Sequence, residues 1–240
     1  MKAYQNLTVL VRLLPQNHTV LVRLPAVSHD RRSSALREGT LPLPAPLLLT
    51  AYTIGMKVEI AEYDARWPCL FQERGERLRQ ALGAIVLRID HISSTSIPGL
   101  AAKPILDIQI SVAALEPLAV FREPLEALHY VFRADNIELT KQYFRESLGT
   151  RREHVHVRKA GSWGEQFALL VRDYMRAHPD EAALYASLKR DLAERYRHDR
   201  HGYTQAKSPF IWSVMQRAAD WSQEIGWEPR PSDVPSGIRA

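Results

Sequence analysis

The sequence contains very little cysteine, since Cys69 is the only one among its 240 residues. A single cysteine excludes an internal disulfide and a cysteine-based zinc cluster, and it is typical of proteins of the reducing cytoplasm. The sequence also lacks an apolar run long enough for a transmembrane helix. These absences predict a cytoplasmic protein that does not associate with a membrane.

A strong excess of one charge is also missing from most of the chain. The formal net charge is +5, and part of the excess comes from residues 1–55, whose only acidic residues are Asp30 and Glu38. The remaining residues are close to balanced, so no basic stripe indicates a nucleic-acid partner. The sequence specifies no oligomeric state.

Residues 1–55 differ in composition from the rest of the chain. The string Thr-Val-Leu-Val-Arg-Leu occurs at residues 8–13 and again at 19–24, but two short copies do not make a repeat architecture. Prolines interrupt the apolar run at residues 41–46, which therefore cannot continue a helix. The predicted organisation is an extension at 1–55 (disordered, or a gene-start error with Met56 as the true initiator), a domain at 56–228 and a flexible tail at 229–240.

Hydrophobic periodicity divides the domain into strands and helices. Ser162 with Glu165 fits a capping box, and Ser208 before Pro209 fits the start of the last helix. The predicted strands span 85–92, 105–112, 130–134, 141–146 and 153–159, and the predicted helices span 67–82, 115–128, 163–177, 181–197 and 209–225. Strands early in the chain and helices at its end favour the α+β class.

The most informative stretch, residues 91–110, reads as a hydroxyl-rich turn followed by a strand. The hydroxyl and backbone N–H groups of Ser94, Thr95 and Ser96 suit a phosphate or another anion. Asp107 on the following strand suits a cation held against that anion. The alternatives are a capped turn without a ligand and a buried carboxylate that neighbouring basic groups neutralise.

His154 and His156 lie two residues apart on a predicted strand, so their side chains share one face. Val155 and Val157 occupy the opposite, apolar face. Paired imidazoles can ligate a metal or perform acid–base chemistry near neutral pH. The alternative is a structural pair of histidines that are hydrogen bonded to their neighbours.

Other conspicuous side chains have a simpler structural interpretation. The charged run at residues 189–200 is predicted as a solvated helix face. His91, directly before the hydroxyl turn, is predicted to be structural. The aromatic residues predicted as core rather than as base-stacking platforms are Trp163, Phe167, Tyr174, Tyr185, Phe210 and Trp212.

The motifs at residues 62–68, 91–108, 154–157 and 203–211 resemble the GrpB family. Members of that family have a nucleotidyltransferase-like α+β fold related to the palm of DNA polymerase β. The resemblance covers about residues 56–225 and implies a mixed sheet with flanking helices and a C-terminal helical segment.

The resemblance further implies a nucleotide or another phosphate-bearing small molecule as ligand, with Mg²⁺ as cofactor. The reaction implied is nucleotidyl transfer to a hydroxyl or amine of a small molecule or protein. The residues assigned in this way are Asp107, His154 and His156 as catalytic, Ser94, Thr95, Ser96, Lys103 and Lys207 as ligand-binding, and Asp107 with Gln109 as metal ligands.

Two positions depart from the pattern that the resemblance implies. Ser93 stands where the family usually has glycine, which would take a positive φ and let a phosphate approach closely. Gln109 stands where active nucleotidyltransferases carry a second aspartate, and a neutral amide is a weaker ligand for a hard cation. This second departure favours the alternative function, a non-catalytic ligand- or partner-binding module that keeps the fold.

Overall fold

The computed structural model describes residues 57–236. The predicted extension at 1–55 lies outside this range, as do residues 237–240. The helices are α2 (Trp67–Leu82), α3 (Ala119–Ala127), α4 (Trp163–Ala177), α5 (Pro179–Arg195) and α6 (Arg200–Ile225), with short 3₁₀ helices η1 (Gly83–Ile85) and η2 (Ser94–Ser96). The strands are β1 (Val86–Ile92), β2 (Leu106–Val112), β3 (Tyr130–Phe132), β4 (Lys141–Glu146) and β5 (Glu153–Lys159).

The strands form one mixed sheet in the order β1-β2-β5-β4-β3. β2 and β5 run parallel, and the other neighbouring pairs run antiparallel. The β2–β5 register places Asp107 opposite His154 and Gln109 opposite His156. The central strand pair therefore brings together two sequence motifs that lie more than forty residues apart.

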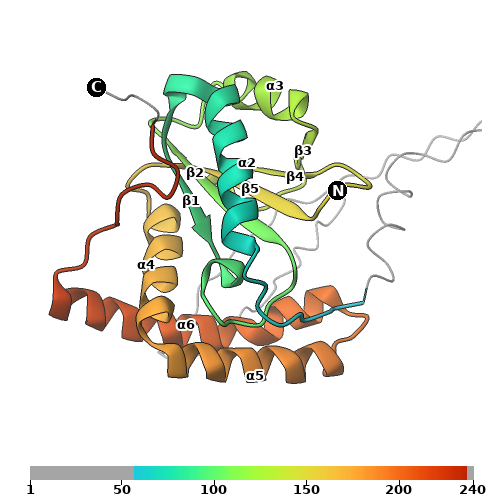
Figure 1. The fold of residues 1–240 in the computed structure, drawn as a ribbon, viewed down its shortest axis with the longest axis vertical. Coiled ribbons are helices and arrows are strands. Elements are labelled where there is room, and N and C mark those ends of the chain that lie inside the picture. The colour runs from blue at the N-terminus through green and yellow to red at the C-terminus, as the bar shows by residue number, and fades with distance from the viewer. Residues whose placement is uncertain (1–56, 237–240) are drawn as a thin grey trace, which may run out of the picture. The chain divides into compact units, whose positions relative to one another are not determined.

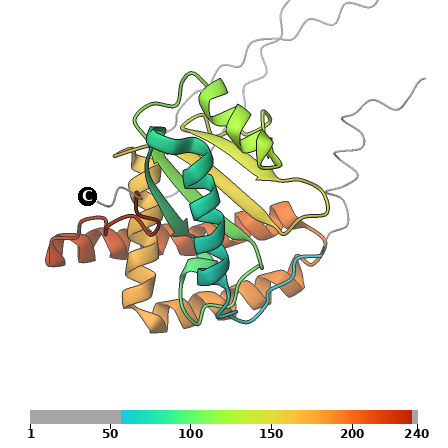
Figure 2. The same ribbon diagram turned by 45° about the horizontal axis from the view of Figure 1, so that its top comes forward.

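One face of the sheet is apolar and is covered by α2 and α3 (Figures 1 and 2). The apolar positions of β2 and β5 alternate with polar ones, as the period-two pattern predicts. The core on this face joins α2, α3 and the sheet through buried residues that include Phe71, Leu78, Ile108, Ile110, Phe121, Leu125, Val155 and Val157.

The opposite face is polar and meets the three C-terminal helices. α5 and α6 lie side by side at one end of the sheet, and α4 connects them to it (Figure 1). A second core joins these helices to the segment after η2, through Ile97, Leu100 and Ala101. Within residues 57–236, no helix is long and apolar enough to cross a membrane. The architecture confirms the predicted α+β class, with its mixed sheet, flanking helices and C-terminal helical segment.

The last helix begins nine residues earlier than predicted. α6 starts at Arg200, because the Asp199 carboxylate caps it by accepting a hydrogen bond from the Gly202 amide at 2.8 Å. Ser208 is therefore not an N-cap, and Pro209 lies inside the helix. The position of Pro209 removes one intrahelical hydrogen bond, which the rest of the long helix tolerates.

The predicted capping box at the start of α4 is also wrong. Ser162 occupies the N-cap position, but its side chain makes no capping hydrogen bond. Glu165 instead accepts hydrogen bonds from the Gly161 amide at 2.8 Å and from the Ser111 hydroxyl at 2.6 Å. Its carboxylate thus links α4 to the sheet rather than closing the first turn of the helix.

Residues 232–234 pack against β1 instead of forming part of the predicted flexible tail. Val234 is buried in the apolar core, and its amide donates to the carbonyl of Ile89 at 3.2 Å. The Asp233 carboxylate accepts from the His91 amide at 2.9 Å and from the buried guanidinium of Arg172 at 3.0 Å. The segment therefore extends the ordered domain past the predicted boundary at residue 228.

Candidate functional site

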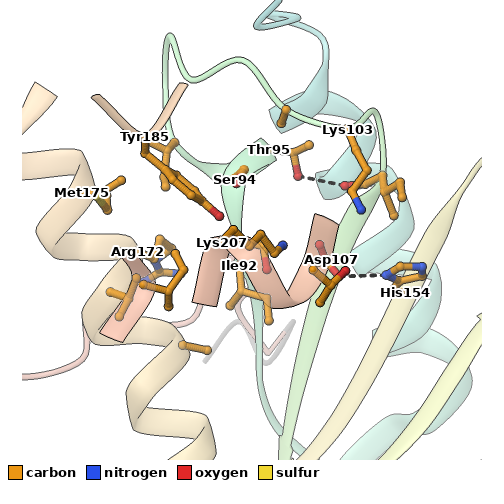
Figure 3. Close-up of a pocket in the computed structure, with 18 of the residues that line it drawn as sticks. Ile92, Ser94, Thr95, Lys103, Asp107, His154, Arg172, Met175, Tyr185 and Lys207 are labelled. Carbon is orange, nitrogen blue, oxygen red and sulfur yellow. Dashed lines mark hydrogen bonds and ion pairs between the residues drawn. The ribbon is translucent and has the colours of Figure 1, made fainter. Parts of the chain in front are cut away.

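A cavity of about 520 Å³ lies between the polar face of the sheet, the η2 turn and helices α4–α6 (Figure 3). The predicted site residues that line it are Ser94, Thr95, Lys103, Asp107, His154, His156 and Lys207. We call this space the site cavity. It joins the hydroxyl turn, the β2 carboxylate, the β5 histidines and the C-terminal lysine, which are far apart in the sequence.

Asp107 is the centre of a hydrogen-bonded triad at the start of the β2–β5 pair. Its Oδ1 atom accepts from Nδ1 of His154 and from Nε2 of His156, each at 3.1 Å. All three side chains are mostly buried and face the site cavity. The structure thus places both histidines on the same face as Asp107, as the alternation predicts.

Burial and hydrogen bonding shift the pKa values of Asp107 and His156. Burial alone would raise the pKa of Asp107, but the hydrogen bonds from His154 and His156 outweigh it and hold that pKa well below its usual range. Burial lowers the pKa of His156, although its bond to Asp107 partly opposes the change. The carboxylate form of Asp107 and the neutral form of the His156 imidazole are therefore favoured.

Three lysine side chains enter the site cavity, and none pairs with a carboxylate within residues 57–236. The Nζ atom of Lys103 lies 4.7 Å from the ring centroid of Tyr203, and that of Lys207 lies 5.6 Å from the same centroid. Nζ of Lys189 lies 4.5 Å from the ring centroid of Tyr185 and donates to the Ala101 carbonyl. Cation–π contacts of this kind hold ammonium groups without neutralising them.

Burial and neighbouring positive charges destabilise the charged forms of these lysines. Burial, with the charges of Lys207 and Arg200, lowers the pKa of Lys103 to about 7. Burial, with Lys207 and Arg190, lowers the pKa of Lys189 to about 7. Burial also lowers the pKa of Lys207. An anion in the cavity would favour the charged forms of these lysines.

The turn that carries the predicted hydroxyls begins with a strained residue. Ser93, which replaces the usual glycine, has φ +63° and ψ −166°, a conformation that is essentially restricted to glycine. Its carbonyl accepts from the Ser96 amide at 3.1 Å and from the Ser96 hydroxyl at 2.6 Å. The serine thus adopts the backbone geometry for which glycine is preferred.

The three predicted hydroxyls have different environments. Ser94 lines the cavity, and the Tyr185 hydroxyl points toward it (Figure 3). The Thr95 hydroxyl is already bonded, since it donates to the Ile105 carbonyl at 3.2 Å and contacts Nε2 of His91 at 3.0 Å. Ser96 does not line the cavity, and its hydroxyl is bonded within the turn. The structure brings Ser94, but not Ser96, to the site.

His91 has the structural environment that the sequence predicts. It is buried, bonded to Thr95 and stacked on Phe71 with ring centroids 4.6 Å apart. Burial, with the nearby charge of Arg176, lowers the pKa of His91 to about 3. A neutral ring in this position orients the hydroxyl turn rather than facing a ligand.

Gln109 is not brought to the site. It is fully buried beside α4, where its Nε2 donates to the Glu165 carbonyl at 3.3 Å. Its Oε1 atom has no partner within residues 57–236. The neighbouring Ser111 contacts the Glu165 carboxylate on the same face. Helix α4 therefore covers the position where a second metal-binding carboxylate would be expected.

Sequence reasoning missed Lys189, Tyr185 and Arg200, which all line the cavity. The prediction of a solvated helix face at 189–200 is wrong for Lys189, which is 2% exposed. The missed signal is that Lys189 continues the buried stripe of α5, four residues after Tyr185. A lysine at such a position is expected to be buried despite its charge.

Two of the aromatic residues predicted as core are at the surface. Trp163 is 64% exposed and Trp212 is 54% exposed, and their rings stack with centroids 6.0 Å apart. Phe167 lies against both and, with Trp212, lines the cavity. Tyr174 and Tyr185 are buried in the core, as predicted.

Comparisons with known proteins place these observations in a family. The family described as GrpB protein matches residues 57–217. The chain is 35% identical over 201 residues to the UPF0157 protein YqkA of Bacillus subtilis, covering 83% of this chain and 59% of that protein. It is 33% identical over 230 residues to a dephospho-CoA kinase of Mycolicibacterium paratuberculosis, covering 85% of this chain and 56% of that protein. The chain thus spans less than two thirds of the length of both relatives.

A solved structure shares the fold. The conserved protein GrpB from Enterococcus faecalis superimposes with a TM-score of 0.64 at 30% sequence identity. The match covers 69% of this chain and 99% of that structure. The family match also includes the hydroxyl turn, both β5 histidines and Lys207 within its residue range. The chain therefore belongs to the GrpB family.

Proposed function

We propose that this protein binds a nucleotide, or another phosphate-bearing small molecule, in the site cavity. One observation carries the proposal: three lysines line the same cavity as the ionised Asp107. They are Lys103, Lys189 and Lys207. Buried ammonium groups without carboxylate partners are costly, and an anionic ligand would offset that cost. The nucleotidyltransferase-like fold of the family supports phosphate as the anion.

The proposed reaction is nucleotidyl transfer to a hydroxyl or amine of a small molecule or protein. The acceptor oxygen or nitrogen would attack the α-phosphorus of a nucleoside triphosphate, and pyrophosphate would leave. Lys103 and Lys207 would hold phosphate oxygens, since their ammonium groups point into the cavity toward Asp107 (Figure 3). Asp107, His154 and His156 line the same space and would position the acceptor, whose proton would leave to water or to the departing pyrophosphate.

A second candidate function is binding without catalysis. Gln109 supports it, because the amide that replaces a second carboxylate is buried against Glu165 and does not reach the cavity. Such a protein would bind the phosphate-bearing ligand and present it, or the ligand-bound surface, to a partner. The two candidates share the binding step and differ only in turnover.

Calorimetric titration of the full chain with the four nucleoside triphosphates and with tripolyphosphate tests the binding step. We expect saturable binding that weakens at least tenfold, about 1.4 kcal/mol, when Lys103 and Lys207 are both replaced by methionine. Lys159→Met is the matched control, because that lysine is exposed at the end of β5. Equal affinity in the double variant and the control would refute the proposed site.

Release of pyrophosphate then separates the two candidates. Incubation with the tightest-binding triphosphate and a mixture of acceptors that carry hydroxyls or amines should release pyrophosphate if the protein is a transferase. The His156→Gln variant should bind the triphosphate but release less pyrophosphate, because the group that helps Asp107 to position the acceptor is altered. Tight binding with no release in any mixture would favour the binding module.

A further inference from the structure

The ion that the fold resemblance implies, Mg²⁺, does not fit the donor atoms of the site. Mg²⁺ prefers near-octahedral sets of oxygen ligands. The carboxylate of Asp107 is flanked by two imidazoles, and the oxygen of Gln109 is buried beside Glu165 rather than in the cavity. The protein therefore offers one oxygen ligand and two nitrogens at the place where an oxygen set would be needed.

We propose that Asp107, His154 and His156 bind a divalent first-row transition metal ion of the zinc or iron(II) type in preference to Mg²⁺. Imidazole nitrogen is a preferred ligand of these ions, and two histidines with one carboxylate form a recurrent set for them. Cys69, the only cysteine, is exposed and outside the site, so no thiolate takes part.

The spacing between the carboxylate and each imidazole is compatible with one shared ion. Oδ1 of Asp107 lies 3.1 Å from Nδ1 of His154 and 3.1 Å from Nε2 of His156, and one ligand atom from each of the three residues lies within 4.8 Å of the others. Ligands bound at about 2.0–2.1 Å and 90–110° apart lie about 2.9–3.4 Å from each other. The observed spacing between the carboxylate and each imidazole falls in this range.

The triad is not a closed hydrogen-bond network within residues 57–236. The far nitrogens, Nε2 of His154 and Nδ1 of His156, are buried and have no partner within residues 57–236. A partly satisfied polar network costs more than an apolar packing of the same size. A bound ion would give each near nitrogen its own ligand bond instead of a share of one carboxylate oxygen, whereas the far nitrogens would keep their protons and would not be satisfied by the ion.

An ion held by the triad would be accessible from the side of the site cavity. The β2–β5 backbone lies on the side away from the cavity, and the site cavity with Lys103 and Lys207 lies on the other (Figure 3). Three protein ligands leave coordination positions open for water or for a ligand oxygen. The proposal does not depend on nucleotide binding, because the triad is formed by the protein alone.

The test uses the full chain, freed of metal by a chelator, and titrates Co²⁺ as a spectroscopic probe and Zn²⁺ by calorimetry, without nucleotide. We expect one equivalent of each to bind and an excess of Mg²⁺ to displace neither. Asp107→Asn and His156→Gln should each weaken binding by more than the roughly 10–100-fold typical of losing an outer-shell partner. His201→Gln, an exposed histidine outside the cavity, is the matched control and should change nothing.

X-ray absorption of the zinc-loaded wild-type protein gives a second readout that does not depend on how a variant folds. Scattering from two imidazole rings in the zinc shell is the expected result. An oxygen-only shell, unchanged Co²⁺ affinity in both triad variants, or displacement of Co²⁺ by the excess of Mg²⁺ would each overturn the proposal. Failure of nucleotide binding would leave these results unchanged, so the two proposals are separately testable.

Discussion

The two faces of the β2–β5 strand pair can be compared residue by residue, because both lie on the same backbone. On one face Ile108, Ile110, Val155 and Val157 are fully buried under α2 and α3. On the other face, polar side chains leave buried atoms without partners, among them Oε1 of Gln109 and the far nitrogens of both histidines. The apolar face stabilises the fold, whereas the polar face lowers stability and is the face that the proposed ligand would contact.

The largest expected effect is on the apolar face. Ile108→Ala should lower the free energy of unfolding by about 3 kcal/mol, since it removes buried methylene groups and leaves a cavity under α2. Urea denaturation, followed by circular dichroism, measures the change. A loss below 1 kcal/mol would mean that this face is not the main source of stability.

The next effect concerns the buried lysines and depends on pH. Because the pKa of Lys189 falls from 10.5 to about 7 on folding, the unfolded chain binds more protons between these values. Stability should therefore rise as the pH increases from about 7 toward 10.5. Lys189→Met should stabilise the ligand-free protein by about 2 kcal/mol at pH 7 or below and flatten that rise.

Thermal unfolding across this pH range is the measurement for Lys189. Part of the slope should remain in the variant, because the pKa of Lys103 is lowered to the same value. Lys159→Met, at an exposed position, should leave both stability and slope unchanged. If Lys189→Met destabilises the protein at pH 7, the Lys189 ammonium group contributes to stability through its contacts. The claim that the polar face costs stability would then be wrong for this residue.

A smaller effect is expected in the hydroxyl turn. Ser93→Gly should stabilise the protein by about 1 kcal/mol, since glycine relieves strain of about 1–3 kcal/mol but loses more backbone entropy on folding. Ser93→Ala keeps the strained backbone and serves as the control, with no gain expected. Equal stability of the glycine and alanine variants would show that the conformation carries no cost.

The smallest effect is expected at Gln109, the polar neighbour of Ile108. Gln109→Leu removes one long hydrogen bond, 3.3 Å to the Glu165 carbonyl, together with an unpartnered buried oxygen. These changes nearly cancel, so the unfolding free energy should shift by less than about 1 kcal/mol. A loss above 2 kcal/mol would give this amide a structural role comparable to that of its apolar neighbour.

The alternation of the two faces could be predicted from the sequence because it is local. The strand at 153–159 and the helix at 163–177 have the predicted bounds, and His154 and His156 share the face that period two assigns to them. The pairing of β2 with β5 is a contact between segments far apart in the sequence, which local periodicity cannot specify. The burial of Lys189 depends on how α5 packs, so a charged run gave no sign of it.

The earlier start of α6 has a similar explanation. Asp199 caps the helix ten residues before Pro209, and a serine–proline pair inside a long helix has the same local pattern as a helix start. As a consequence, Tyr203, Thr204 and Lys207 belong to helix α6, from which all three line the cavity. The exposure of Trp163 and Trp212 likewise follows from tertiary packing, which aromatic content alone does not predict.

The central claim is that the polar face forms a binding site for the phosphates of a nucleotide. A crystal structure of the protein with a non-hydrolysable nucleoside triphosphate tests it most directly. We expect phosphate oxygens within hydrogen-bond distance of Lys103 and Lys207, in the cavity beside Asp107. A triphosphate bound elsewhere, such as at the smaller pocket lined by Arg74 and Arg77, with the site cavity left empty, would contradict it.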